Sequence, residues 1–337
     1  MSINDLHQII GDYRPEAPVT PERIQAWLDQ FGEDADFVLS ETILLMKERY
    51  LSKSRALDFL DSTVRWLIQN ALIGSNISLL SIQKTGKSQK DLISLFSEVS
   101  SMPSFTVNEV RPNFIYLDDC CFTGTTVLRD LRNWLNFSNG SKTNLQILKN
   151  GEATLHIVFF FLHYPKLKDR LYYLFKEHEC LEAFNRMKIA RVHELDKDDR
   201  CIPLNLYHEK FDGFKDAIEE RHKQNISKYG EQRPELYYID KHKSHAPFSS
   251  VDARSKYDMI MLSKSIEIYN KAKNKLEWLP PLGYTQKTER SFGFGAYAFT
   301  WRNVPNNTPL VFWYKGGGHI PLFDKAERGT VDYDDYA

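Results

Sequence analysis

The stretch Phe114-Ile115-Tyr116-Leu117-Asp118-Asp119-Cys120-Cys121-Phe122-Thr123-Gly124-Thr125-Thr126-Val127 decides the fold class of this chain. Its first four residues are apolar, which is typical of a strand buried on both faces in the middle of a parallel sheet. Two acids and a short turn follow, and the apolar residues then recur at helical spacing up to Leu135. The stretch therefore predicts a strand, an acidic pair, a Thr/Gly loop and a helix, in that order.

This order brings carboxylates and anion-binding groups to one corner of the fold. Backbone N–H groups at a helix start bind anions, and Gly124 lets the backbone approach a phosphate closely. Three hydroxyl side chains add further donors: Thr123, Thr125 and Thr126. Because carboxylates repel phosphate, we expect Asp118 and Asp119 to face a sugar diol or a bridging Mg²⁺ on the same ligand. A ribose 5-phosphate meets both demands, whereas a simple turn and helix cap explains the acids but not the threonines.

The remaining pattern is that of an α/β protein. Apolar runs predict buried strands over residues 76–82 and 154–163, with helices over residues 91–99, 127–135 and 165–189. Strands that alternate with helices favour a mostly parallel sheet flanked by helices. We therefore expect three regions: a helical N-terminal region (1–72), an α/β core (73–204) and a C-terminal α+β extension (205–337).

Composition limits the environment more than the function. Lys and Arg number 44 against 45 Asp and Glu, so the overall charge favours neither nucleic acid nor membrane. The four cysteines show no paired CxxC spacing, and the chain has no signal peptide and no apolar run of membrane-spanning length. We expect a soluble cytoplasmic protein without a membrane partner.

A second polar loop follows the strand predicted over residues 76–82. It contains Lys84, Thr85, Gly86, Lys87 and Ser88. Its end looks like a Walker A motif, but that motif needs glycine five positions before Gly86, where this chain has Ser81. Two interpretations stay open, a diphosphate-binding loop and a solvated basic turn. The first gains support from the acidic stretch, because ligands of open α/β sheets bind at the carboxyl ends of the strands.

The hydrophobic strand, two acids and Thr/Gly loop resemble the phosphoribosyl diphosphate (PRPP) binding motif of type I phosphoribosyltransferases. The resemblance implies a Rossmann-like phosphoribosyltransferase fold and Mg²⁺ bound together with PRPP or a nucleotide. Asp118 and Asp119 would then be the catalytic acids that hold the diol and the ligand-bridged Mg²⁺. Residues 123–126 would bind the 5-phosphate, and residues 84–88 the diphosphate. Phe122 departs from the family, which usually has a small or hydroxylated residue there.

The C-terminal part is similar to the tail of phosphoribosyltransferase-like effectors of bacterial conflict systems. The similarity lies in Asn306-Asn307-Thr308-Pro309, the aromatic run after it and Pro321-Leu322-Phe323. That family includes anti-phage proteins encoded beside retron reverse transcriptases. The resemblance implies a toxin of retron type, with a small phosphoribosyl compound or nucleotide as ligand and a reverse transcriptase with its nucleic acid as regulatory partner.

Two functional classes stay open at this point. An enzyme would be a phosphoribosyltransferase or a nucleotide glycosidase, acting on an N-glycosidic or diphosphate bond at ribose C1, and the intact acids favour it. A non-catalytic module would sense a nucleotide or bind a partner with the same pocket. The short segment 89–112 favours this second class, because it leaves no room for the long mobile hairpin of many phosphoribosyltransferases.

The aromatic residues near the C-terminus also allow two interpretations. They could form a surface on which a base stacks, or the core of a small β-unit in which residues 310–314 are the return strand. The core interpretation is favoured. The residues concerned are Phe292, Phe294, Tyr297, Phe299, Trp301, Phe312, Trp313 and Tyr314.

Overall fold

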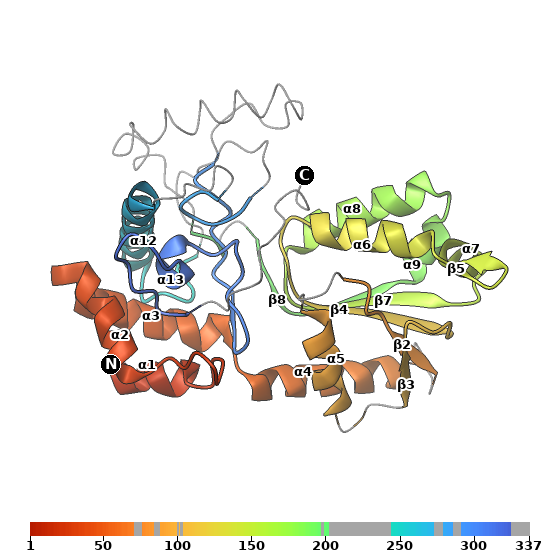
Figure 1. Cartoon of the computed structure of the whole chain (residues 1–337), viewed down its shortest axis with the longest axis horizontal. Coiled ribbons are helices and arrows are strands. Elements are labelled where there is room, and N and C mark those ends of the chain that lie inside the picture. The colour runs from red at the N-terminus through yellow and green to blue at the C-terminus, as the bar shows by residue number, and fades with distance from the viewer. Residues whose placement is uncertain are drawn as a thin grey trace. The chain divides into compact units, whose positions relative to one another are not determined.

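The computed structural model describes residues 1–70, 76–83, 88–99, 101, 104–196, 199–201, 244–272, 279–285 and 291–324. The chain forms two compact units (Figure 1). One combines Met1–Ser52 with Leu195–Ala326, and the other contains Lys53–Glu194. The first helices therefore pack with C-terminal segments. The division into a helical N-terminal region, an α/β core and a C-terminal α+β extension stays a prediction.

The second unit contains a five-stranded sheet in which every pair of neighbours is parallel. Its strands, in spatial order, are β3 (Phe105–Val107), β2 (Ile77–Leu79), β4 (Asn113–Cys121), β7 (Thr154–Leu162) and β8 (Lys188–Glu194). The apolar run Phe114 to Leu117 is almost fully buried in β4. The predicted α/β fold and its central buried strands are confirmed.

Helices cover both faces of this sheet (Figure 1). On one face lie α4 (Lys53–Gln69) and α5 (Gln89–Ser97), where the ring of Phe59 meets that of Phe160 edge-on at 6.2 Å. On the other lie α6 (Thr125–Leu135), α7 (Asn144–Lys149), α8 (Tyr164–Glu177) and α9 (Leu181–Arg186). Val127 and Leu131 of α6 and Leu171 of α8 share one apolar core with Phe114 and Tyr116. Burial of these side chains is the main force that holds the layers together.

The long helix predicted over residues 165–189 is wrong. It is divided into α8 and α9, because Glu179 adopts a left-handed conformation with φ 51° and ends the first helix. Strand β8 then follows, and within the described residues it pairs with β7 alone. Its residues are mostly half-buried, so it lacks the continuous apolar run by which β4 and β7 could be predicted.

The first unit is largely helical within the described ranges. It contains α1 (Ile3–Ile10), α2 (Pro21–Leu28), the 3₁₀ helix η1 (Asp29–Asp34), α3 (Ala35–Arg49), α12 (Val251–Lys271) and α13 (Leu310–Trp313). The predicted start of α2 is confirmed, since Thr20 accepts a hydrogen bond from the Arg23 amide and Pro21 occupies the first turn. Strand β1 (Tyr50–Leu51) pairs in parallel with β9 (Phe299–Thr300), which joins distant parts of the chain.

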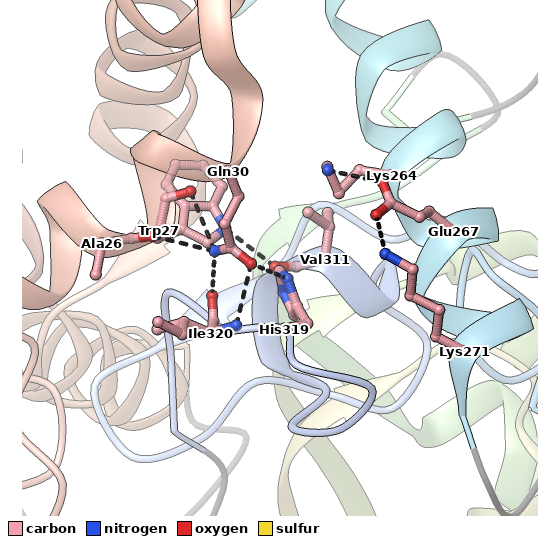
Figure 2. Close-up of polar contacts among 9 residues, drawn as sticks. All are labelled: Ala26, Trp27, Gln30, Lys264, Glu267, Lys271, Val311, His319 and Ile320. Atoms are coloured by element: carbon pink, nitrogen blue, oxygen red, sulfur yellow. Dashed lines mark hydrogen bonds and ion pairs between the residues drawn. The ribbon is translucent and has the colours of Figure 1, made fainter.

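A partly buried polar cluster also joins the ends of this unit (Figure 2). The Trp27 Nε1–H donates to the Val311 carbonyl at 3.0 Å, and the Gln30 amide exchanges hydrogen bonds with the Ile320 backbone at 2.8 and 3.1 Å. His319 Nδ1 lies 2.7 Å from Gln30 Oε1, and its Nε2 lies 2.9 Å from the Val311 oxygen. Burial lowers the pKa of His319 below its usual value. Each buried polar group here has a partner, as stability requires.

The C-terminal aromatic residues form core, as favoured from the sequence. Six of the eight are buried, and the Phe299 and Phe312 rings lie edge to face at 5.0 Å. The strand predicted over residues 310–314 is wrong, because residues 310–313 form helix α13. A run of four apolar residues fits either a strand or a short buried helix, and contacts with α2 and α12 decide between them here.

Candidate functional site

The sheet has a topological switch point between β2 and β4. From β2 the chain passes through α5 to β3 on one side, whereas from β4 it passes through α6 to β7 on the other. In open α/β sheets, ligands bind in the crevice outside the carboxyl ends of two such strands. Residues 83–88 follow β2 in the chain. Asp118 and Asp119 lie within β4, which continues to Cys121 instead of ending before the acids as predicted, and residues 122–124 connect it to α6. Lys84, Thr85, Gly86 and Lys87 lie outside the described residues, while Ser88 lies within them.

Asp118 is buried at the end of β4, with 5% of its surface exposed, and both of its carboxylate oxygens accept hydrogen bonds. Oδ2 accepts from Gln83 Nε2 at 2.6 Å, and Oδ1 accepts from the Ser88 hydroxyl and from the Asp119 amide at 2.8 Å. Gln83 and Ser88 flank segment 84–87, so Asp118 fixes both ends of the predicted diphosphate loop.

The environment of Asp118 disfavours its ionised form. Burial, followed by the charge of Asp119, raises the pKa of Asp118 to about 7, although the bonds from Ser88, the Asp119 amide and Gln83 oppose this. Protonated and ionised forms are therefore both populated near neutral pH. A shifted pKa of this kind is common at functional sites.

The two acids differ in their surroundings. Successive side chains of a strand point to opposite faces, so Asp118 shares a face with Tyr116 and Asp119 points the other way. Asp119 is half-buried, whereas Asp118 is almost completely enclosed. The carboxylate of Asp118 is thus enclosed and bonded to its own chain, whereas that of Asp119 lies nearer the solvent.

Polar residues behind Asp118 support it. Gln83 Nε2 also donates to the Tyr116 hydroxyl at 3.1 Å, and that hydroxyl donates to Asp130 Oδ2 at 3.4 Å. The Gln89 side chain accepts from the Gln83 amide at 3.0 Å. Sequence reasoning missed all four of these residues. Tyr116 alone gave a signal, since it is the one hydroxylated residue of the apolar run and stands two positions before Asp118.

The start of α6 presents donors that the helix does not use. Gly124 is the N-cap residue with φ 74° and ψ −3°, and its lack of a side chain leaves this helix start without a side-chain cap. The first intrahelical bond runs from the Leu128 amide to the Gly124 carbonyl at 3.0 Å, so the earlier amides lack helical acceptors. Three half-buried hydroxyls stand beside them: Thr123, Thr125 and Thr126. The alternative in which the acids cap this helix is wrong, because Gly124 is the N-cap.

The described residues fit a Mg²⁺ ion carried by a ligand. They contain no group of three or more His, Cys, Asp or Glu residues placed to hold a metal. Magnesium in phosphate sites is commonly bound through one or two carboxylates together with phosphate oxygens and water. A half-buried carboxylate such as Asp119 matches that donor set, whereas a cage made of protein groups is not present in this part of the chain.

Comparison with known families gives a match to PRTase-CE, the phosphoribosyltransferase of conflict-system effectors, over residues 24–325. The chain belongs to the PRTase-CE family. Its five-stranded parallel sheet is consistent with a phosphoribosyltransferase fold, so the predicted family and fold are confirmed. No curated protein matches the chain. Within the residues that the structure describes, no helix is long and apolar enough to cross a membrane.

Proposed function

We propose that the switch point between β2 and β4 binds a phosphoribosyl compound, either PRPP or a nucleotide. One observation carries the proposal: in a chain of the PRTase-CE family, β4 ends with an acidic pair and two cysteines, and the start of α6, which has no side-chain cap, follows it. The 5-phosphate would lie on residues 123–126, since helix-start amides and hydroxyls bind anions. The ribose diol would lie beside the acids.

The two acids would have different tasks. Asp119 would hold the diol and a Mg²⁺ ion bridged by the ligand. Asp118 would hold Gln83 and Ser88, and through them the loop of residues 84–88 that we predict to bind diphosphate. This division modifies the prediction that both acids act directly on the ligand. Single Asp→Asn variants distinguish the two versions.

Reaction at ribose C1 would break a bond to diphosphate or to a base nitrogen through an oxocarbenium-like transition state. Positioning and electrostatic stabilisation supply most of such catalysis, and bound Mg²⁺ would neutralise the departing diphosphate.

A second candidate is a sensor that binds without turnover. It is supported by the short connection of residues 98–112, which includes β3 and offers little chain to close over reacting atoms.

Calorimetry of the full chain against PRPP with Mg²⁺, beside a panel of nucleoside monophosphates, tests the proposal when the products of each mixture are also analysed. Binding with turnover identifies an enzyme, and binding without turnover identifies a sensor. We expect the double variant Asp118→Asn/Asp119→Asn to lose binding while staying folded. Asp36→Asn, an exposed acid in the first turn of α3, serves as control. Wild-type binding by the folded double variant, or no binding by the wild type, would contradict the site.

The biological setting is also proposed. Family membership shows a phosphoribosyltransferase-like domain of the conflict-system type. The action we propose for it is toxic consumption of PRPP or a nucleotide in retron-type anti-phage defence. A reverse transcriptase with its nucleic acid would act as regulatory partner in the cytoplasm. The expected readout is growth arrest that disappears in the double variant.

A further inference from the structure

Arg170 is a residue of α8 that the fold brings to the start of α6. Strand β7, which precedes α8, is the parallel neighbour of β4. The His163 amide donates to the Cys121 carbonyl at 2.9 Å, so the start of α8 is bonded to the end of β4. Leu167 and Leu171, one turn apart on α8, share the apolar core with Val127 of α6. These contacts fix the second turn of α8 beside the Thr/Gly loop.

The absence of a side chain at Gly124 makes room for Arg170. A Cβ atom at position 124 would lie 2.9 Å from Arg170 Cδ and 3.6 Å from its Nε. The first distance is shorter than real Cβ contacts, and Nε belongs to the guanidinium group. The outer part of the Arg170 side chain, from Cγ to Nε, therefore fills the space beside Gly124 in the loop that we propose to bind the 5-phosphate.

The charge of Arg170 acts at this loop. Burial and the charge of Asp118 raise the pKa of the Cys121 thiol to about 12, whereas the Gly124 amide and Arg170 favour its ionised form. A cation beside a helix start lies at the wrong end of the helix dipole. The first turns of α6 and α8 contain no acidic residue. Arg170 and the start of α6 thus place positive charge at the same loop, which favours a bound anion.

We propose that Arg170 binds the 5-phosphate and makes the site select phosphorylated ribose over ribose without phosphate. This inference rests on the proposed function. A guanidinium group donates two parallel hydrogen bonds to phosphate oxygens, and a phosphate monoester carries nearly two negative charges at neutral pH. Arg170 would supply the charge, while residues 123–126 supply directed hydrogen bonds.

The test compares PRPP with Mg²⁺, ribose 5-phosphate and ribose as probes of the full chain, the two sugars by competition with PRPP. We expect Arg170→Ala to weaken the binding of PRPP and ribose 5-phosphate about 10- to 100-fold and to leave the affinity for ribose unchanged. Arg170→Lys keeps the charge but lacks the planar guanidinium group, so its affinity for the phosphorylated probes should lie between those of the wild type and Arg170→Ala. The control is Arg132→Ala, an exposed cation in the last turn of α6 that pairs with Glu177 at 2.9 Å.

The outcomes separate this inference from the proposed function. Wild-type affinity in Arg170→Ala, together with lost affinity in the double aspartate variant, would overturn the role of Arg170 and keep the site. An equal loss of affinity for ribose and for the phosphorylated probes would also overturn the role of Arg170, because a general distortion of the site weakens the binding of both. Absence of binding of PRPP, ribose 5-phosphate and every nucleoside monophosphate of the panel by the wild type would overturn both proposals.

Discussion

At the scale of single residues, Asp118 shows how a site can be held together by an acid that is costly to ionise. Its carboxylate is enclosed beside a second acid, which disfavours the charge. Three donors from its own chain partly compensate. Asparagine keeps the shape and removes the titration, and its amide nitrogen replaces one of the two acceptor oxygens.

We predict that Asp118→Asn weakens the pH dependence of stability. The pKa of Asp118 rises from 3.8 in the unfolded chain to about 7 in the folded one, so its contribution to the free energy of unfolding is complete below about pH 4 and is lost as the pH rises through 7. Urea unfolding between pH 5 and 8.5 measures this loss, which the variant should not show. Asp169→Asn, an exposed acid in the same unit, is the control. Equal pH slopes in Asp118→Asn and wild type would contradict the assignment.

At the scale of elements, the start of α6 depends on one glycine for two separate reasons. The backbone at Gly124 is left-handed, and the space beside it is occupied by Arg170. Gly151, just after α7, has nearly the same φ, 73° against 74°, but an added Cβ there would meet nothing within 4 Å. The chain therefore contains its own control for the cost of conformation alone.

We predict that Gly124→Ala destabilises the sheet-containing unit more than Gly151→Ala. Both substitutions force alanine into a left-handed conformation at about 1–2 kcal/mol, while only the first collides with Arg170. Urea unfolding of both variants measures the difference, and adding Arg170→Ala to Gly124→Ala should recover the steric part. Equal costs at the two glycines would show that Arg170 does not occupy this space.

At the scale of the whole molecule, the two units are built differently along the chain. The sheet-containing unit is continuous over Lys53–Glu194 in the described residues. The other combines Met1–Ser52 with segments after Leu195, through the bond from Trp27 to Val311, the His319 cluster and the pairing of β1 with β9. The N-terminal helices bury their apolar faces against a later part of the chain.

We predict that a fragment of residues 53–194 folds alone and that a fragment of residues 1–52 does not. The first keeps its sheet and both helical layers, whereas the second leaves Trp27, Tyr50 and other core residues without the partners they have in the whole chain. Circular dichroism with urea unfolding measures this. Addition of a fragment of residues 195–337 should restore helical signal to the first 52 residues. Cooperative unfolding of the short fragment by itself would contradict the prediction.

The sequence alone determined those features that depend on neighbours along the chain. A continuous apolar run identified β4 and β7, a Thr-Pro start identified α2, and the acid and threonine pattern indicated the family, while the site it suggests stays a prediction. These signals are local because burial of a strand or of one helix face imposes a short period on the sequence. The half-buried edge strand β8 and the short helix α13 carried no such period and were missed.

Tertiary structure alone decided which distant groups meet. Ser88 and Gln83 reach Asp118 across 30 and 35 residues, and Arg170 reaches Gly124 from α8, the helix that follows β7. Such contacts depend on the order of strands in the sheet and on which helix covers which face. Polar residues in loops give no periodic signal of their eventual partners, so their roles become visible only when the sheet order brings the loops together.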